Sequence, residues 1–281
     1  MDNLKKIIAH DSNINVVMAA LHVVNRMAKG LRDRFCCFIS MIWSVILDKS
    51  KDKKVNVRVA VGEALDAISD VCGTDRLTKD LCEHLSKPNP QSKQCLCSFL
   101  TRYFVRQTTV ELEFAKAVLP IVVKHASDSD PSVRDAACST LGSARRLLGK
   151  GLDAFLAPII TEKAKLDKVE EYCEEAKKQH EEFLASRPQR GPSSGHASGD
   201  VVESISEEVG TSASDHAKDV DPWTLMDPTN VVEKLRQDFD ELMASKKWQE
   251  RKEAVDSMLS IVESAPRVEM SPELQQVMTT L

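Results

Sequence analysis

The sequence predicts an all-α protein in which helix pairs stack into an α-solenoid, and three observations support this fold class. Aromatic residues make up only 5% of the 281 residues, and 10 Gly and 11 Pro are few for a chain of many hairpins. This composition disfavours a β-sandwich or barrel. Apolar residues recur at helical rather than alternating spacing. The third observation is an internal repeat, which fixes how the helices are arranged.

Each copy of the repeat begins at a polar or proline-containing turn and continues into an amphipathic helix. The four copies start at Asn13, Val55, Pro90 and Pro131, at intervals of roughly 40 residues, the length of a HEAT-type helix pair. Two apolar positions four residues apart lie on one helical face. They recur in every copy as Ala19 and Val23, Val61 and Leu65, Leu96 and Leu100, and Ala137 and Leu141.

Each of these helices is preceded by another apolar-periodic helix, over residues 4–9, 35–48, 77–86 and 112–125. A fifth pair is predicted over residues 152–165 and 168–183, with its turn at Leu166 and Asp167. A helix pair cannot cover its own apolar face, so neighbouring pairs must stack. Trp43 lies inside an apolar stretch and is expected in the core.

The composition changes after the fifth pair. Residues 186–220 are rich in Ser and Gly and contain no Leu, Met or aromatic residue, so they cannot bury enough apolar surface to fold and are expected to be disordered. Helical spacing resumes after Asp227-Pro, which has the pattern of a helix start. A turn at residues 245–248 then separates two helices, so a further helix pair is predicted here.

Composition and motifs exclude several classes of function. The net charge of −5 disfavours nucleic-acid binding, and no apolar run is long enough to span a bilayer. The sequence has no glycine-rich phosphate loop, His-x-x-x-His pair or nucleophile motif, so no enzyme activity and no cofactor are expected. Cys95 and Cys97 have no second pair at zinc-site spacing, which predicts buried cytosolic thiols rather than a metal site.

Two stretches resemble TOG domains of the microtubule polymerase family that includes ch-TOG and Mini spindles. Lys246-Lys-Trp-Gln-Glu-Arg-Lys-Glu-Ala, preceded by Asp227-Pro and Leu235-Arg-Gln-Asp-Phe, is similar to the first HEAT repeat of such a domain. The first 180 residues are similar to the second to sixth repeats. The motifs that carry this likeness are Asp11-Ser-Asn-Ile-Asn-Val, Gly30-Leu-Arg-Asp-Arg-Phe, Lys87-Pro-Asn-Pro and Asp128-Ser-Asp-Pro-Ser-Val-Arg-Asp-Ala-Ala.

The resemblance implies a division of the chain into three parts. Residues 1–184 would form a TOG-like domain of five HEAT pairs, a flat paddle that lacks its first repeat. Residues 185–221 would form a flexible linker, and residues 222–281 would begin a second TOG-like domain with its first repeat. The chain would then be a slice of a longer array.

The resemblance also implies a function. TOG paddles bind αβ-tubulin along one edge formed by the turns inside the repeats, which would promote microtubule plus-end growth and organise spindle and centrosome microtubules. Centrosomal or kinetochore adaptor proteins are possible further partners, and the cytoplasm and the microtubule cytoskeleton are the expected location. The tubulin-binding candidates are Trp248, Lys247, Asn13, Asn15, Lys54, Val55, Asn56, Lys93, Ser132, Arg134, Lys165 and Lys168. Lysines at successive turns line up in a solenoid, and such a basic strip suits an acidic partner.

Structural roles compete with binding at several of these positions. Trp248 is either an exposed interface anchor or packed under its turn, and Arg134 is either a ladder residue between repeats or a partner contact. Lys93 replaces that arginine one repeat earlier and is expected to be more exposed, which favours contact. The asparagines are helix caps first and contacts second. The alternative function is a general HEAT scaffold, phosphatase-subunit-like or transport-receptor-like, that uses a concave face instead of a turn edge.

Overall fold

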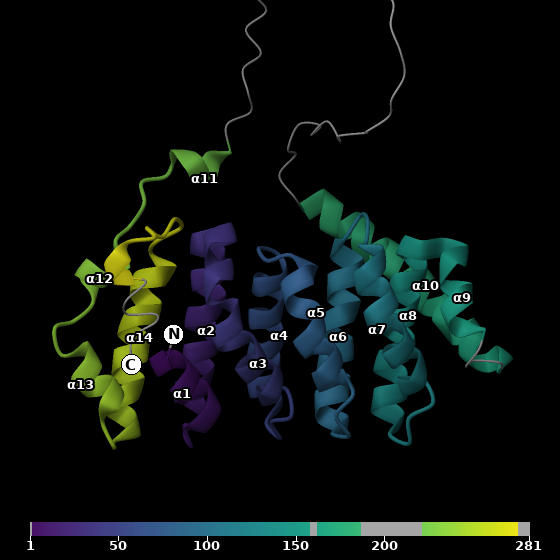
Figure 1. Ribbon diagram of the computed structural model, residues 1–281, viewed down its shortest axis with the longest axis horizontal. Helices are drawn as coiled ribbons and strands as arrows, with labels where there is room; N and C mark the ends of the chain where they lie inside the picture. Colours follow the sequence, from purple (N-terminus) through teal and green to yellow (C-terminus); the bar gives the residue numbers. More distant parts are fainter. Residues whose placement is uncertain (1, 158–161, 187–220, 275–281) are drawn as a thin grey trace, which may run out of the picture.

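The computed structural model describes residues 2–157, 162–186 and 221–274, and within them the fold is a row of antiparallel helix pairs (Figure 1). Most of the predicted linker, residues 187–220, lies outside the described residues. The pairs are α1 (Asp2–His10) with α2 (Ile14–Leu31), α3 (Ile39–Lys49) with α4 (Val55–Ser69), α5 (Thr74–Leu85) with α6 (Pro90–Arg106), and α7 (Leu112–His125) with α8 (Pro131–Leu148). The short α9 (Asp153–Leu156) precedes the long α10 (Lys163–Ser186).

The remaining elements connect these pairs or follow them. The 3-10 helices η1 (Arg32–Phe38) and η2 (Gly149–Leu152) lead into α3 and α9. After residue 220 come α11 (Pro222–Leu225), α12 (Val231–Lys234), α13 (Phe239–Ala244) and α14 (Trp248–Glu263). The all-α solenoid of HEAT-like pairs is therefore confirmed. No helix in the described part of the chain is long and apolar enough to cross a membrane.

Polar residues at the turns explain where the second helices begin. Asn13, Asn89 and Asp130 each cap a helix, because their side-chain oxygens accept hydrogen bonds from free N–H groups of the first turn. Pro90 and Pro131 then occupy the first helical position, where a missing N–H costs nothing. The repeat starts predicted from the sequence are thus true helix starts.

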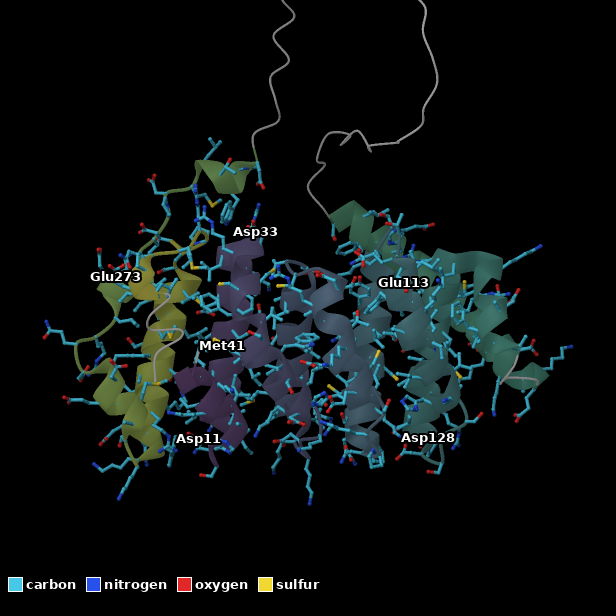
Figure 2. The ribbon with its side chains drawn as sticks, viewed as in Figure 1. Asp11, Asp33, Met41, Glu113, Asp128 and Glu273 are labelled. Atoms are coloured by element: carbon cyan, nitrogen blue, oxygen red, sulfur yellow. The ribbon has the colours of Figure 1, made fainter. Side chains whose placement is uncertain are left out.

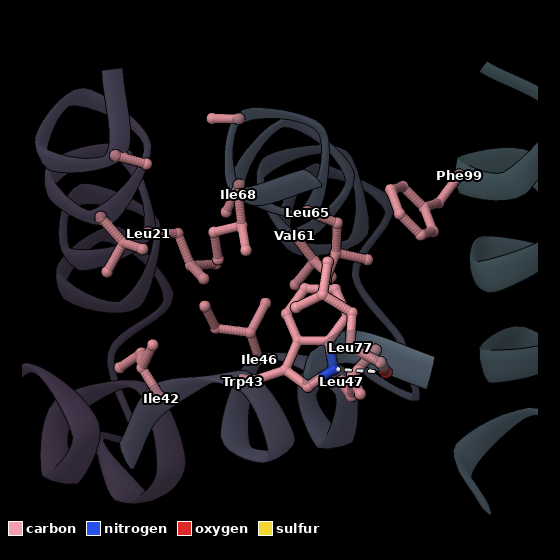
Figure 3. Packing of buried hydrophobic residues seen from close by; sticks show 14 of the residues in the cluster. Leu21, Ile42, Trp43, Ile46, Leu47, Val61, Leu65, Ile68, Leu77 and Phe99 are labelled. Atoms are coloured by element: carbon pink, nitrogen blue, oxygen red, sulfur yellow. Dashed lines mark hydrogen bonds between the residues drawn. The ribbon is translucent and has the colours of Figure 1, made fainter. Parts of the chain in front are cut away.

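The core runs continuously along the row, between the first and second helices of each pair and between neighbouring pairs. Trp43 is fully buried near its centre, and its indole N–H donates to the carbonyl of Leu77 on α5 at 3.1 Å (Figure 3). Its ring meets Phe99 of α6 edge to face, with centroids 6.5 Å apart. A single side chain therefore ties two successive pairs together, as expected for a stack in which no pair covers its own apolar face.

The fifth pair differs from its prediction. No turn occurs at Leu166 and Asp167, since α10 runs without interruption from Lys163 to Ser186. Val169, Cys173 and Ala176 are its buried residues. Their spacing of four and three forms one stripe on a continuous helix, and neither Gly nor Pro breaks it. The helix α10 thus begins at Lys163, before the predicted turn, and Lys165 and Lys168 lie on its first turns.

The C-terminal helices lie at the other end of the row. There α14 packs along α2, and α13 packs on α14 (Figure 1). Ala254, Val255, Met258 and Val262 of α14 belong to the same buried cluster as the apolar residues of α2. In space the order of pairs is therefore α13–α14, then α1–α2, and so on to α9–α10. The three-part division inferred from the sequence stays a prediction.

Candidate protein-binding edge

The turns inside the helix pairs lie along one edge of the row. Asp11 and Asp128, from the turns before α2 and α8, lie at this edge, whereas Asp33 and Glu113, from connections between pairs, lie at the opposite edge (Figure 2). We call the five turns of residues 11–13, 50–54, 86–89, 126–130 and 245–247, with the first helical turns that follow them, the turn edge. Equivalent turns align because each pair repeats the preceding one.

The most exposed candidates cluster in the part of the turn edge where α14, α2 and α4 begin. The side chain of Lys247 is 74% exposed, and Val55 and Trp248 are 60% and 38% exposed. A partly exposed Trp at the start of a helix has the character of an interface anchor. Val55 also lines a surface hollow of about 500 Å³ between the α1–α2 and α3–α4 turns. The other residues of this hollow are Ser12, Asn13, Ile14, Asn15, Met18, Lys54 and Asn56.

Lys54 is the clearest free cation at this hollow. Its backbone N–H donates to the carboxylate of Asp52 at 2.9 Å, which fixes the turn. Its ammonium group is exposed and forms no ion pair with any residue that the structure describes. Lys247, by comparison, pairs with Glu250 one helical turn later. Lys54 can therefore pair with an acidic group of a partner without breaking an ion pair within this protein.

The predicted asparagine and serine sites divide into caps and exposed groups. Asn13 is the cap of α2 and accepts from the N–H of Asn15 at 2.9 Å. Asn15 and Asn56 do not cap a helix; both lie exposed on the first turns of α2 and α4. Ser132 donates its hydroxyl to Asp130 at 2.5 Å, and these hydrogen bonds lower the pKa of that carboxyl. Asn13 and Ser132 therefore already form hydrogen bonds within their own turns, whereas the side chains of Asn15 and Asn56 are exposed for contact with a partner.

Arginines at one repeated position hold the turns together. Arg58, Arg134 and Arg251 each stand four residues after the cap of a second helix. The Nη1 of each donates to one or two carbonyl groups of its own turn. Arg134 donates to the carbonyls of Asp128 and Ser129, both at 2.8 Å. Arg134 thus belongs to its own repeat, a role that neither sequence-based alternative described.

Lys93 occupies the same position in α6, and its predicted exposure was wrong. Its ammonium group pairs with the carboxylate of Asp128 in the next turn at 2.7 Å, and the two side chains are only 15% and 12% exposed. The hydrogen bond from Lys93 is the largest cause that lowers the pKa of Asp128. The sequence could not show this, because the partner carboxylate lies 35 residues away.

Lys165 and Lys168 join α10 to the preceding pair. Lys165 donates to the hydroxyl of Ser127 at 3.0 Å, and Lys168 donates to Asp135 of α8 at 2.5 Å. Asp135 also accepts from the hydroxyl of Tyr172 at 2.8 Å, and the hydrogen bond from Lys168 is the main cause of its lowered pKa. Both lysines therefore stabilise the stack, at the far end from Trp248.

The sequence analysis missed Asp11 and Arg251. The guanidinium group of Arg251 donates to both carboxylate oxygens of Asp11, at 2.6 and 3.0 Å, across 240 residues of sequence. The Asp11 side chain is only 2% exposed. Burial alone would raise its pKa, but hydrogen bonds from Arg251 and from the N–H of Asn13 outweigh burial and lower it. The shared position of Arg58, Arg134 and Arg251 after their caps was the available signal.

One grouping in the described ranges has metal-binding residue types, namely Glu170, Cys173 and Glu174 on α10. Glu170 pairs with Arg145 at 3.2 Å and Glu174 with Lys177 at 2.6 Å. Burial raises the pKa of the Cys173 thiol, which disfavours the thiolate that a metal would need. These ion pairs account for the carboxylates without a metal ion.

Comparisons with known proteins agree with this geometry. The sequence profile of the HEAT repeat matches residues 118–143. Zygote defective protein 9 of Caenorhabditis elegans is 31% identical over 277 residues, which are 95% of this chain and 20% of the relative. Protein mini spindles of Drosophila melanogaster is 34% identical over 176 residues, which are 62% of this chain and 8% of the relative. The chain thus spans a fifth or less of the length of these relatives.

Two solved structures share the fold. A chain from a study of microtubule plus-end tracking by XMAP215, CLIP-170 and EB1 is 33% identical with a TM-score of 0.56, over 62% of this chain and 72% of that chain. A chain from a study of tubulin recruitment and assembly by microtubule polymerases with TOG domain arrays is 25% identical with a TM-score of 0.56, over 61% of this chain and 36% of that chain. The protein therefore belongs to the TOG-domain HEAT-repeat family of Zygote defective protein 9 and mini spindles.

Proposed function

We propose that this protein binds αβ-tubulin through its turn edge, without catalysing a reaction, and so supports growth at microtubule plus ends. The observation that carries the proposal is the alignment of the turns before α2, α4, α6, α8 and α14 along one edge, in a member of the TOG-domain family (Figure 1). That edge presents the exposed Trp248 and Lys247 at the start of α14, and the exposed Lys54 at a surface hollow between the turns before α2 and α4. An aromatic anchor with basic neighbours suits an acidic protein surface.

The binding candidates separate into two groups by what their side chains already do. Trp248, Val55, Asn15, Asn56, Lys54 and Lys247 are exposed and form the proposed contact surface. The other candidates are held by other groups of the stack: Lys93, Ser132, Arg134, Lys165, Lys168 and the cap Asn13. In this proposal these residues hold the turns in position relative to one another, and any contact they make with tubulin is secondary.

The mechanism is preferential binding of one tubulin conformation. An edge that fits a curved, free dimer better than a straight dimer in the lattice releases tubulin as the lattice forms, because a binding protein favours whichever state it binds more tightly. In a longer array, several such edges on one chain raise the local concentration of tubulin at the growing end. No cofactor is needed for this step.

The location follows from the same proposal. Relatives include a spindle pole body component of Schizosaccharomyces pombe, 34% identical over 162 residues, and a centrosomal protein of Dictyostelium discoideum, 38% identical over 52 residues. We propose the cytoplasm and the microtubule cytoskeleton, at spindle poles and centrosomes, as the site of action. Action at kinetochores, with adaptor proteins there, stays a prediction.

The test is size-exclusion chromatography of the full chain with free αβ-tubulin, at low and raised salt. We expect co-elution that weakens with salt. Lys54→Glu should reduce it, because a repulsive charge replaces an attractive one at an exposed site. Lys116→Glu is the matched control, since Lys116 is also exposed but lies near Glu113 at the opposite edge. Equal loss in both variants, or no co-elution of the wild type, would refute binding through the turn edge.

A further inference from the structure

The C-terminal helices take the place of a preceding repeat in the stack. The hydrogen bonds of Arg251 show this. It stands four residues after the cap of α14, holds its own turn through the carbonyl of Ser245 at 2.7 Å, and pairs with Asp11 in the next turn. Lys93 of α6, at the same position, pairs with Asp128 in the next turn. The contact between α14 and the turn before α2 is therefore equivalent to the contact between α6 and the turn before α8.

A second set of contacts joins the C-terminal segment to α2 at the opposite edge of the row. The N–H of Val268 donates to the carbonyl of Gly30 at 3.0 Å. A Cβ atom on Gly30 would lie 2.7 Å from a methyl group of Val268, so the close approach requires glycine. The guanidinium groups of Arg32 and Arg267 both lie over the Trp223 ring, at 4.5 and 4.7 Å from its centroid. The C-terminal segment is thus fixed at both edges, and its place along the stack is defined.

This placement decides where the exposed anchor lies. Trp248 begins α14 and Lys247 precedes it, so their position along the turn edge depends on the Arg251–Asp11 pair a single helical turn away. Asn13 and Asn15 follow Asp11 directly in the neighbouring turn. The pair therefore places the turn that carries Trp248 next to the turn before α2. The Trp248 side chain itself lines a separate surface hollow, together with Arg236, Lys252 and Glu253 among others.

We propose that the tubulin-binding edge of this protein is a composite of the two ends of its own chain, and that Arg251 and Asp11 are its positioning residues. Residues 221–274 act as the terminal repeat of the stack, so that Trp248 and Lys247 bind tubulin together with the turns before α2 and α4. The occupant of the outer α2 face is the C-terminal segment of the same chain. This inference rests on the proposed function for its ligand, but the docking of residues 221–274 stands independently.

Complementary chemistry supports an occupant from this chain. The buried carboxylate of Asp11 meets a bidentate guanidinium group, the arrangement that satisfies both oxygens. Arg26 of α2 faces Glu263 of α14 at 3.5 Å, and Arg32 forms an ion pair with Asp221. The apolar residues of the two helices close a single core. Charges therefore match at three points along one interface, which sets both its register and its direction.

The experiment measures docking and binding separately in the full-length chain. Amide hydrogen exchange reports the protection of α2 and α14, and size-exclusion chromatography with light scattering reports mass and co-elution with tubulin. Arg251→Glu should speed exchange in both helices and weaken tubulin binding about tenfold, the cost typical of losing an anchor residue. The double variant Asp11→Lys with Arg251→Glu restores an ion pair of reversed polarity, and it should recover part of both losses.

A steric variant tests the same interface at the other edge. Gly30→Leu should displace Val268 and raise exchange in α14, whereas Gly151→Leu should not, because the nearest atom to a Cβ there is 4.0 Å away. Trp248→Ala should weaken tubulin binding without changing exchange. Failure of Arg251→Glu to alter exchange would overturn the docking, and faster exchange with unchanged tubulin affinity would overturn the composite edge. Protection found only in a species of twice the chain mass would assign the α2 face to a second copy and overturn docking within one chain.

The two proposals fail in different ways. If the wild type does not co-elute with tubulin, the proposed function and the composite binding edge are both refuted. The exchange data on Arg251→Glu and on the double variant still decide whether the C-terminal segment docks on α2.

Discussion

Gly142→Ala should destabilise the end of the stack, although alanine is the better helix former. Gly142 lies inside α8 where α10 crosses it. A Cβ atom there would lie 2.5 Å from the Cβ of Tyr172, 2.7 Å from the carbonyl carbon of Tyr172 and 2.8 Å from the amide nitrogen of Cys173. These atoms belong to the backbone of α10 or are fixed to it, so no side-chain rotation relieves the overlap. The helix α10 must therefore move away by several tenths of an ångström or more.

The magnitude follows from two opposing effects. Replacing Gly by Ala in a helix interior contributes about 1 kcal/mol in favour of the folded state. Overpacking costs about 1–3 kcal/mol, and we expect about 3 kcal/mol here because the obstruction is backbone. The net result is a destabilisation of about 2 kcal/mol, which lowers Tm by about 4–8 °C for a folded region of this size.

Gly62→Ala is the matched control because the opposite sign is expected. Its added Cβ would meet only the guanidinium group of Arg102, at 2.8 Å from Nη2 and 3.7 Å from Cζ. That side chain is 43% exposed and can turn aside. The variant should be neutral or up to about 1 kcal/mol more stable. Circular dichroism during heating and urea titration, with amide exchange across α10, measures both variants. An unchanged or raised Tm for Gly142→Ala would refute the close α8–α10 contact.

Three further predictions follow from the described contacts. Leu141→Ala should lower the free energy of unfolding, measured by urea titration, by about 2–5 kcal/mol, because the side chain is fully buried between neighbouring pairs and its truncation leaves a cavity. A change near zero would mean that no such cavity forms. Lys93→Met should cost about 1–3 kcal/mol, since it leaves the carboxylate of Asp128 without its charged partner, and a Lys177→Met control at the exposed pair with Glu174 should cost far less. The pKa of Asp128 is lowered in the folded state, mainly by the hydrogen bond from Lys93. The ionised Asp128 therefore contributes fully to the free energy of unfolding above pH 3.8, its pKa in the unfolded chain, and this contribution is lost as pH falls through the lower pKa of the folded state. Unfolding free energy measured from pH 5 to pH 2 should therefore fall less steeply in Lys93→Met than in the wild type, and parallel curves would contradict this assignment.

Local sequence patterns were enough to predict the helix pairs and their repeat. Amphipathic spacing and capping residues are local signals, and the starts of α2, α4, α6 and α8 fell where Asn13, Val55, Pro90 and Pro131 predicted them. Leu65, Leu100 and Leu141 are buried on the predicted inner faces. The burial of Trp43 followed from its apolar neighbours, because a helix that is apolar on most of its surface must be covered. The fifth turn was predicted wrongly, since nothing local distinguishes a turn at Leu166 from a helix that simply continues.

Which charged residues of the turn edge are free depends on how the helix pairs stack. Lys93 and Lys54 both look like exposed lysines near a helix start in the sequence, yet one is held by Asp128 and the other is unpaired among the described residues. The same holds for Arg251, whose carboxylate partner is Asp11 at the other end of the chain. A carboxylate 35 or 240 residues away leaves no trace in local periodicity. Such contacts arise only when the pairs stack, because stacking brings together turns that lie one repeat apart or at opposite ends of the chain.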